Sequence, residues 1–130
     1  MGKLDDIKLT VLYIEYKNFF IDILSRFYNF EKCDVYHYGE ILNIDELCLN
    51  NALNWDIYLI EFFGRGRVNW KYLSKNRCLQ CTVELLDEYY DCWEWNMLSS
   101  NEGIFWTELM INKYKSKLNW DLLSLNKSLP

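Results

Sequence analysis

Hydrophobic and polar positions repeat along the last two-thirds of the chain with a period of 25 or 26 residues. A large apolar residue opens each copy and a leucine follows three positions later, so both lie on one face of a helix. The opening residues are Ile44, Trp70, Trp95 and Trp120. A fixed period of this length is typical of arrays in which each unit buries its apolar face against its neighbours.

A second helix is predicted in each copy. Eleven positions after the opening residue comes Trp55, Cys81 or Trp106, and the next residue is of a type that caps helix N-termini. The expected caps are Asp56, Thr82 and Thr107. The apolar residues that follow have helical spacing. The pattern therefore predicts units of a short helix followed by a longer one.

Asparagine occupies one position in every copy, six residues after the opening residue. These residues are Asn50, Asn76, Asn101 and Asn126. Asparagine tolerates the left-handed backbone conformation that often ends a helix, so the pattern predicts that the first helix stops there. One extra residue lies within residues 64–67, where two glycines favour an insertion in a turn.

Residues 1–43 fit the pattern poorly and are predicted to be an N-terminal cap or degenerate repeat of the same single domain. Within them, residues 19–27 are interpreted as a degenerate second helix, residues 10–16 also fit a strand, and residues 34–43 read as an aromatic-rich connection. Terminal units of an array are expected to be atypical because one of their faces has no neighbour.

The predicted fold is all-α: a short helical-repeat solenoid of about three and a half two-helix units over residues 44–130, preceded by the irregular cap. The sequence given ends where the second helix of the fourth unit is expected, which leaves the Trp120 face without its usual neighbour. Either self-association through this C-terminal repeat or a truncated chain is therefore a further expectation.

The composition of the chain argues against several classes of protein. The chain is 51% hydrophobic and 18% aromatic, and none of its apolar runs reaches the roughly 20 residues of a membrane span. Five scattered cysteines do not fit a disulfide framework, so a cytoplasmic protein with reduced thiols is expected. The net charge of −5 makes nucleic acid an unlikely partner and favours another protein.

The sequence gives little support for a catalytic or metal site. Cys78 and Cys81 form a C-x-x-C motif, but Cys81 occupies a position where other units have tryptophan, and a second pair of metal ligands is missing. His37 is the only histidine. The serines that recur after the leucines follow the repeat, whereas a catalytic nucleophile would be unique. The sequence therefore predicts no catalytic residue, cofactor or metal ion, and the chain is not expected to be an enzyme.

A contact surface is predicted from aromatic residues outside the core stripe of the repeat, because tyrosine and tryptophan dominate binding hot spots. The candidate protein-binding residues are Tyr58, Phe62, Tyr90 and Trp93, with Asp87 and Asp91 from the acidic segment around the last two. The alternative left open is that the aromatic residues cover the seams between units, and that the acidic residues form an ordinary solvated helix face.

The pattern resembles the Trp-rich W-x-x-L-S-x-N helical repeats of many uncharacterised bacterial and large-DNA-virus proteins. The unit that fits best carries Trp95, Leu98, Ser99, Asn101, Ile104, Trp106, Thr107, Glu108, Leu109, Lys113 and Tyr114. The likeness covers residues 44–130, with departures at Ile44, Cys48 and Cys81. Since that family has no common activity, the resemblance implies a fold and a scaffold role only.

The function expected from these observations is a non-catalytic protein–protein interaction module. The alternative is a small acidic inhibitor or immunity-type protein that blocks a toxin, nuclease or other effector with its acidic and aromatic residues.

Overall fold

A computed structural model describes residues 16–129 of the chain. These residues form helices and loops, with one isolated parallel β-bridge between Trp55 and Leu79. A helix covers residues 16–27, and it is followed by α2 (Lys32–Tyr38), α3 (Ile44–Cys48), α4 (Ile57–Phe63), α5 (Trp70–Ser74), α6 (Val83–Glu88), α7 (Trp95–Ser100), α8 (Glu108–Lys113) and α9 (Trp120–Ser124). The all-α prediction is thus confirmed for the described part.

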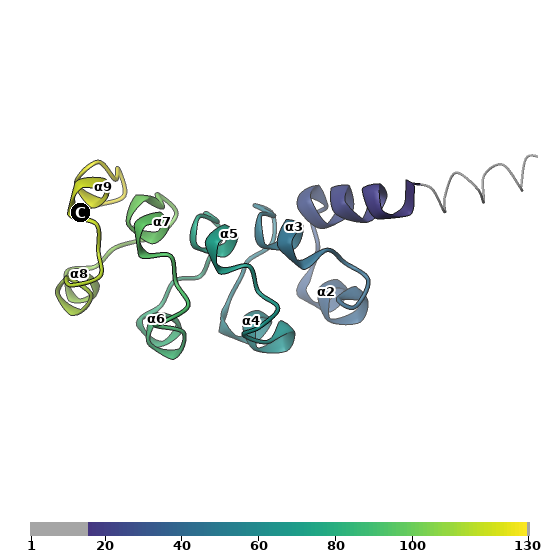
Figure 1. The fold of residues 1–130 in the computed structure, drawn as a ribbon, viewed down its shortest axis with the longest axis horizontal. Helices are drawn as coiled ribbons and strands as arrows, with labels where there is room; N and C mark the ends of the chain where they lie inside the picture. Colours follow the sequence, from purple (N-terminus) through teal and green to yellow (C-terminus); the bar gives the residue numbers. More distant parts are fainter. Residues whose placement is uncertain (1–15, 130) are drawn as a thin grey trace, which may run out of the picture.

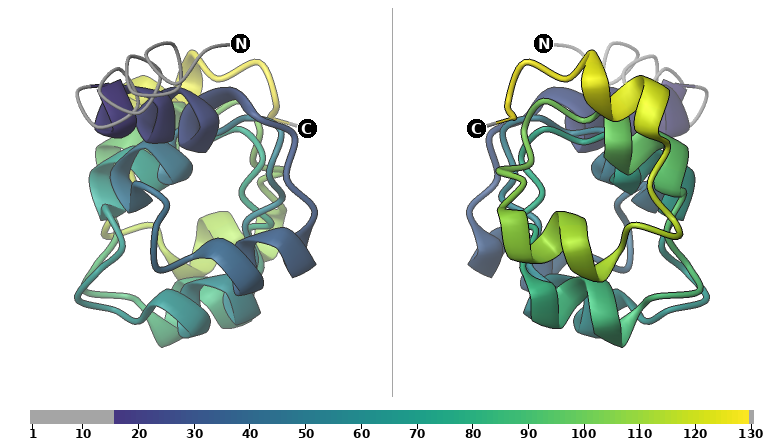
Figure 2. Two further views of the ribbon diagram at one scale, coloured as in Figure 1. Left: turned by 90° about the vertical axis from the view of Figure 1, so that its right-hand side faces the viewer. Right: turned by 90° about the vertical axis from the view of Figure 1, so that its left-hand side faces the viewer.

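The helices lie in two rows. The helix over residues 16–27, α3, α5, α7 and α9 form the upper row, and α2, α4, α6 and α8 form the lower row (Figure 1). Viewed along the rows, each helix lies behind its predecessor, and the connecting loops run down the two remaining sides (Figure 2). Consecutive upper-row helices from α3 to α9 contact one another.

The predicted caps of the lower-row helices are confirmed. Asp56 accepts a hydrogen bond from the Leu59 backbone N–H, and Thr82 and Thr107 do the same for α6 and α8. The upper row has caps that the sequence analysis did not identify. The side chains of Asn43, Asn69 and Asn119 accept backbone N–H bonds at the starts of α3, α5 and α9, and each such cap stabilises its helix by about 1 kcal/mol.

The repeated asparagines do not adopt the left-handed conformation, so that prediction is wrong. Among residues 16–129 only a glycine, Gly64, has a positive φ. The four asparagine side chains are instead buried between consecutive units. Each one donates hydrogen bonds from Nδ2 to two backbone carbonyls of the preceding unit. We call Asn50, Asn76, Asn101 and Asn126 the asparagine ladder.

The bonds of the asparagine ladder have the same geometry along the chain. Asn101 Nδ2 donates to the Ser74 and Asn76 carbonyls, both at 3.0 Å, and Asn101 Oδ1 accepts the Gly103 backbone N–H at 2.9 Å. Asn126 repeats this arrangement one unit later, with carbonyls at 2.9 and 3.1 Å. Each buried amide makes at least three bonds, so both of its N–H groups and its oxygen are satisfied without water.

Buried serines provide a second link between units. Ser74 Oγ donates to the Trp70 carbonyl at 2.6 Å and accepts the Glu94 backbone N–H at 3.1 Å. Ser99 makes the equivalent pair of bonds to the following unit. Both serines are fully buried. The hydroxyl therefore fixes the start of the next upper-row helix against the end of the previous one.

The same serine pattern corrects the interpretation of the N-terminal region. Ser25 Oγ donates to the Ile21 carbonyl and accepts the Asn43 backbone N–H, as Ser74 and Ser99 do in later units. Residues 19–27 therefore belong to an upper-row helix rather than a degenerate second helix, and residues 34–43 contain most of α2 rather than only a connection. The alternative strand over residues 10–16 falls outside the described residues except for Tyr16, which is helical.

The hydrophobic core runs between the two rows. Trp55 and Trp106 are fully buried, and the Trp55 indole N–H donates to the Leu47 carbonyl at 3.0 Å. Leucines from both rows complete this layer, including Leu47, Leu59, Leu73, Leu85, Leu86, Leu98 and Leu123. Of the helices within residues 16–129, none is long and apolar enough to cross a bilayer.

Candidate protein-binding surface

Tyr58 and Phe62 lie on α4 in the lower row and are exposed, at 69% and 42% of their surface. Phe62 packs edge-on against Tyr36 of α2, with ring centroids 4.9 Å apart, and Tyr36 is exposed as well. Large aromatic surface left in water favours contact with a partner. We call Tyr36, Tyr58 and Phe62 the aromatic patch.

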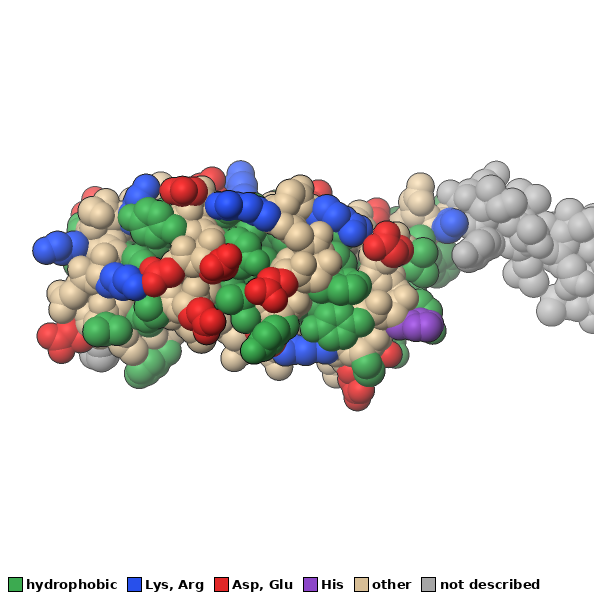
Figure 3. Space-filling model, turned by 90° about the horizontal axis from the view of Figure 1, so that it is seen from below, with side chains coloured by type: hydrophobic (Ala, Val, Ile, Leu, Met, Phe, Trp, Pro, Cys, Tyr) green, Lys and Arg blue, Asp and Glu red, His purple; other side chains and the backbone are tan. Residues whose placement is uncertain are grey.

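Acidic side chains gather next to the aromatic patch, toward the middle of the face formed by the lower row (Figure 3). Exposed carboxylates of α4, α6 and the loop after α6 contribute: Glu61, Glu84, Asp87, Glu88 and Asp91. The face therefore changes from apolar to negative along the row, which suits a partner with both an apolar and a basic region.

Asp87, one of the predicted binding residues, is already engaged within the chain. Its carboxylate pairs with Lys113 of α8 and accepts a hydrogen bond from the Tyr114 hydroxyl at 2.8 Å. The hydrogen bonds from Lys113 and Tyr114 lower the pKa of the Asp87 carboxyl. Asp87 thus ties α6 to the following unit, while Asp91 is exposed and free of ion pairs within the described residues.

Tyr90 lies in the seam between units and is partly buried. Its ring packs against Trp95 at 5.5 Å and Tyr114 at 6.4 Å, and the Lys117 ammonium lies 5.2 Å from its centre. The geometry favours the alternative that the sequence analysis left open for this residue, namely that it covers a seam.

Trp93 was predicted to lie outside the core, and this is wrong. Only 5% of its surface is exposed, and its ring packs edge-on against Trp70 at 4.9 Å. The repeat in the sequence could have predicted the burial of Trp93. Two residues before each opening residue the chain has an apolar side chain, and these are Leu42, Val68, Trp93 and Leu118. All four belong to the core or pack against it.

Replacing Trp93 with leucine, the residue present in two other units, is expected to lower the free energy of unfolding by about 2 kcal/mol because it leaves a cavity. The Trp93 indole N–H is buried without a hydrogen-bond partner among the described residues. Because the substitution also removes this unpaired group, the expected loss of stability is smaller than for a fully satisfied tryptophan. Urea denaturation measures the change. Trp120→Leu is the control, since Trp120 is 53% exposed and should lose less. Equal losses would contradict the burial of Trp93.

A second apolar region, not predicted from the sequence, lies at the N-terminal end of the rows. The helix over residues 16–27 exposes Tyr16, Phe19, Phe20, Ile23, Leu24 and Phe27. A hollow of about 300 Å³ lies beside it, lined mainly by apolar residues between Leu24 and Leu42. The repeat register could have indicated this region. Leu24 corresponds to the buried Leu73, and Phe27 takes the position of the ladder asparagine.

The cysteines do not assemble a metal site. In the part of the chain that the structure describes, no group of three or more His, Cys, Asp or Glu side chains could hold a metal ion. Burial raises the pKa of the Cys48 and Cys81 thiols to about 12. Cys81 packs against the core, in agreement with its place in the tryptophan position of the repeat.

Thiol labelling at pH 8 should separate the cysteines by environment. Cys33 is exposed, so iodoacetamide should modify it about 100-fold faster than Cys48 and Cys81, whose raised pKa keeps them protonated. Mass spectrometry of time points identifies the modified peptides. In 6 M urea the difference should disappear, because unfolding exposes all the thiols. Rapid labelling of Cys81 in the native protein would contradict its burial.

Comparison with known proteins adds no relative: no family model, curated protein or solved structure matches this chain.

Proposed function

We propose that this chain is a short helical-repeat solenoid that acts as a non-catalytic protein-interaction module, with the aromatic patch as its contact surface. The asparagine ladder and the buried serines support the solenoid, because they join consecutive units through bonds that recur at the repeat spacing. The exposure of Tyr58, Tyr36 and Phe62 is the observation that carries the binding role.

The aromatic patch differs from the rest of its row. The position of Tyr58 is taken by Glu84 in α6 and Leu109 in α8, and the position of Phe62 by Glu88 and Lys113. The repeat therefore does not require aromatic side chains there. Rings that neither cap a helix nor fill the core are best explained by a partner that covers them. We place this partner in the cytoplasm, where the free cysteines stay reduced.

The test is quantitative affinity capture from an extract of the native host, with the wild-type chain, a Tyr58→Ala/Phe62→Ala variant and a Leu109→Ala control. Leu109 is 68% exposed at the position equivalent to Tyr58, so its replacement removes exposed apolar surface from the same row outside the aromatic patch. For a protein that contacts the aromatic patch, the captured amount should fall at least tenfold with the double variant and stay unchanged with the control. Equal recovery with both variants would refute the proposal.

The alternative function is an acidic inhibitor that blocks a toxin, nuclease or other effector. The exposed carboxylates of Glu84, Glu88 and Asp91 favour it. Charge reversal of Glu88 and Asp91 to lysine should then abolish capture while Tyr58→Ala/Phe62→Ala leaves it intact, and binding should weaken steeply with salt. Asp87 is unsuitable for this test because its replacement also breaks the contacts to Lys113 and Tyr114.

A further inference from the structure

The seams between lower-row helices use the same two positions of the repeat. Counted from the N-cap of each helix, the fifth residue of one helix meets the sixth residue of the next. Between α2 and α4 these residues are Tyr36 and Phe62, whose ring centroids lie 4.9 Å apart. Between α6 and α8 they are Asp87 and Lys113, which form an ion pair. An aromatic contact and an ion pair thus join equivalent places at these two seams.

The seam between α4 and α6 has two acidic residues at these positions, Glu61 and Glu88. Both side chains are exposed, and within residues 16–129 neither lies within ion-pair distance of a lysine or arginine. Burial raises the pKa of the Tyr89 hydroxyl, and the negative charges of Glu61 and Glu88 raise it further. The two carboxylates therefore lie near the same hydroxyl, one on each side of the seam.

The basic residue beside this seam is Arg65, in the loop after α4. Its Nε donates to Cys92 Sγ at 2.9 Å, and among the described residues it forms no ion pair with Glu61 or Glu88. Like charges that face each other between helices repel, so a cation that enters between the two carboxylates relieves the seam. Lys113 shows that the repeat has room for an ammonium group at this position.

We infer that the protein that covers the aromatic patch places a lysine or arginine side chain between Glu61 and Glu88, as Lys113 is placed one seam further along. The inference rests on the proposed function and specifies the chemistry of the partner: a segment with a basic side chain beside apolar ones. Tyr58 lies one helical turn before Glu61 and Phe62 on α4. A single segment can therefore cover the rings and reach the carboxylates.

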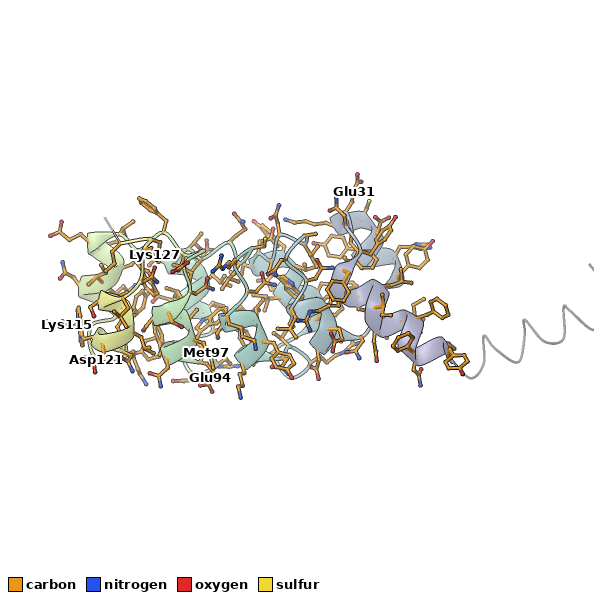
Figure 4. All side chains as sticks on the ribbon, turned by 90° about the horizontal axis from the view of Figure 1, so that it is seen from above. Glu31, Glu94, Met97, Lys115, Asp121 and Lys127 are labelled. Atoms are coloured by element: carbon orange, nitrogen blue, oxygen red, sulfur yellow. The ribbon has the colours of Figure 1, made fainter. Side chains whose placement is uncertain are left out.

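The charge around the aromatic patch favours a basic protein segment over other ligands. Acidic side chains gather on the lower-row face (Figure 3). The opposite face carries both signs around α7 and α9, where Glu94 and Asp121 are acidic and Lys115 and Lys127 are basic (Figure 4). A nucleic acid or an anionic membrane would be repelled by the acidic face, and a free polyamine would leave the aromatic rings uncovered.

The first test is structural and needs no partner. Glu88→Lys places an ammonium group opposite Glu61, as Lys113 lies opposite Asp87. It should raise the midpoint of thermal unfolding by about 2 °C, because an ion pair replaces a repulsion. The control Glu94→Lys makes the same change in net charge on the opposite face and should not raise the midpoint. An unchanged midpoint in Glu88→Lys would overturn the inference, since the two positions would then not face each other.

The second test uses peptides from a random library displayed on phage and selected on the full wild-type chain. The selected peptides should carry lysine or arginine beside apolar residues. Fluorescence polarisation then measures the dissociation constant of the most enriched peptide. It should rise at least tenfold with Glu61→Gln/Glu88→Gln, which keeps the side-chain shapes but removes both charges, and with Glu88→Lys, which fills the place of the cation. Glu94→Lys should change it less than twofold.

The same peptide separates this inference from the proposed function. If Tyr58→Ala/Phe62→Ala weakens binding tenfold and Glu61→Gln/Glu88→Gln does not, the aromatic patch stands and the inference is overturned. If only the glutamine variant weakens binding, the site for a basic side chain is supported and the aromatic patch fails instead. A selection that enriches no basic peptide, or a peptide that neither variant weakens, also overturns the inference.

Discussion

Replacing Asn101 with aspartate is expected to lower the free energy of unfolding by about 3 kcal/mol or more at pH 7. Aspartate has the same shape and can still accept the Gly103 N–H. It loses both donated bonds, however, and places a carboxylate against the Ser74 and Asn76 carbonyls in a buried site. Unpaired buried charge of this kind is among the most destabilising changes in a protein core.

The loss should also depend on pH. Burial without a cation raises the folded-state pKa of the introduced carboxyl above its unfolded value, so the folded variant holds its proton longer. The difference from wild type should therefore be smallest below about pH 4 and grow as the pH rises. Urea unfolding at pH 4 and 7 measures this. The control Asn112→Asp adds the same charge at an exposed site on α8 and should change stability little. A loss equal to that of the control would refute the role of the asparagine ladder.

Gly103→Ala is expected to cost about 3 kcal/mol, because the loops of consecutive units touch at this glycine. A Cβ atom at Gly103 would lie 2.3 Å from the Arg77 carbonyl oxygen and 2.6 Å from the Arg77 Cα. These are backbone atoms, so relief requires the two loops to separate, which also stretches the Asn101 bonds to the preceding unit.

Gly66→Ala is the matched control for this substitution. Gly66 lies in the turn between α4 and α5, and an added Cβ would meet nothing within 4 Å. Its replacement should be neutral or stabilise the protein by about 0.5 kcal/mol through the unfolded state. Chemical denaturation of both variants provides the comparison. A Gly103→Ala variant as stable as Gly66→Ala would show that the units are not in contact at this loop.

The sequence predicted the helices from 44 onward well because apolar spacing, the three lower-row caps and the period agree with one another. It failed where one residue type serves two physical roles. Asparagine can end a helix in the left-handed conformation or bond to backbone in a buried loop. The absence of glycine from this position favoured the second role, because glycine can replace asparagine in a left-handed cap but not in the asparagine ladder.

The candidate surface was predicted only in part. Tyr58, Phe62 and Asp91 are exposed as expected, but Trp93 is in the core, Tyr90 covers a seam and Asp87 ties two units together. These contacts join residues about 25 positions apart, so they depend on how units stack rather than on helical phase within one unit. Only alignment of every position across units, including those before the opening residue, would have identified Trp93.

The one-way arrangement of the asparagine amides has a consequence for how the molecule forms during synthesis. A layer emerging from the ribosome brings its own donor and finds both of its acceptors already in place on the layer made before it, so folding can keep pace with translation without waiting for distant segments. Until the next layer arrives, the carbonyls of the layer made last stay exposed to water. Each layer can therefore dock as soon as it has been synthesised.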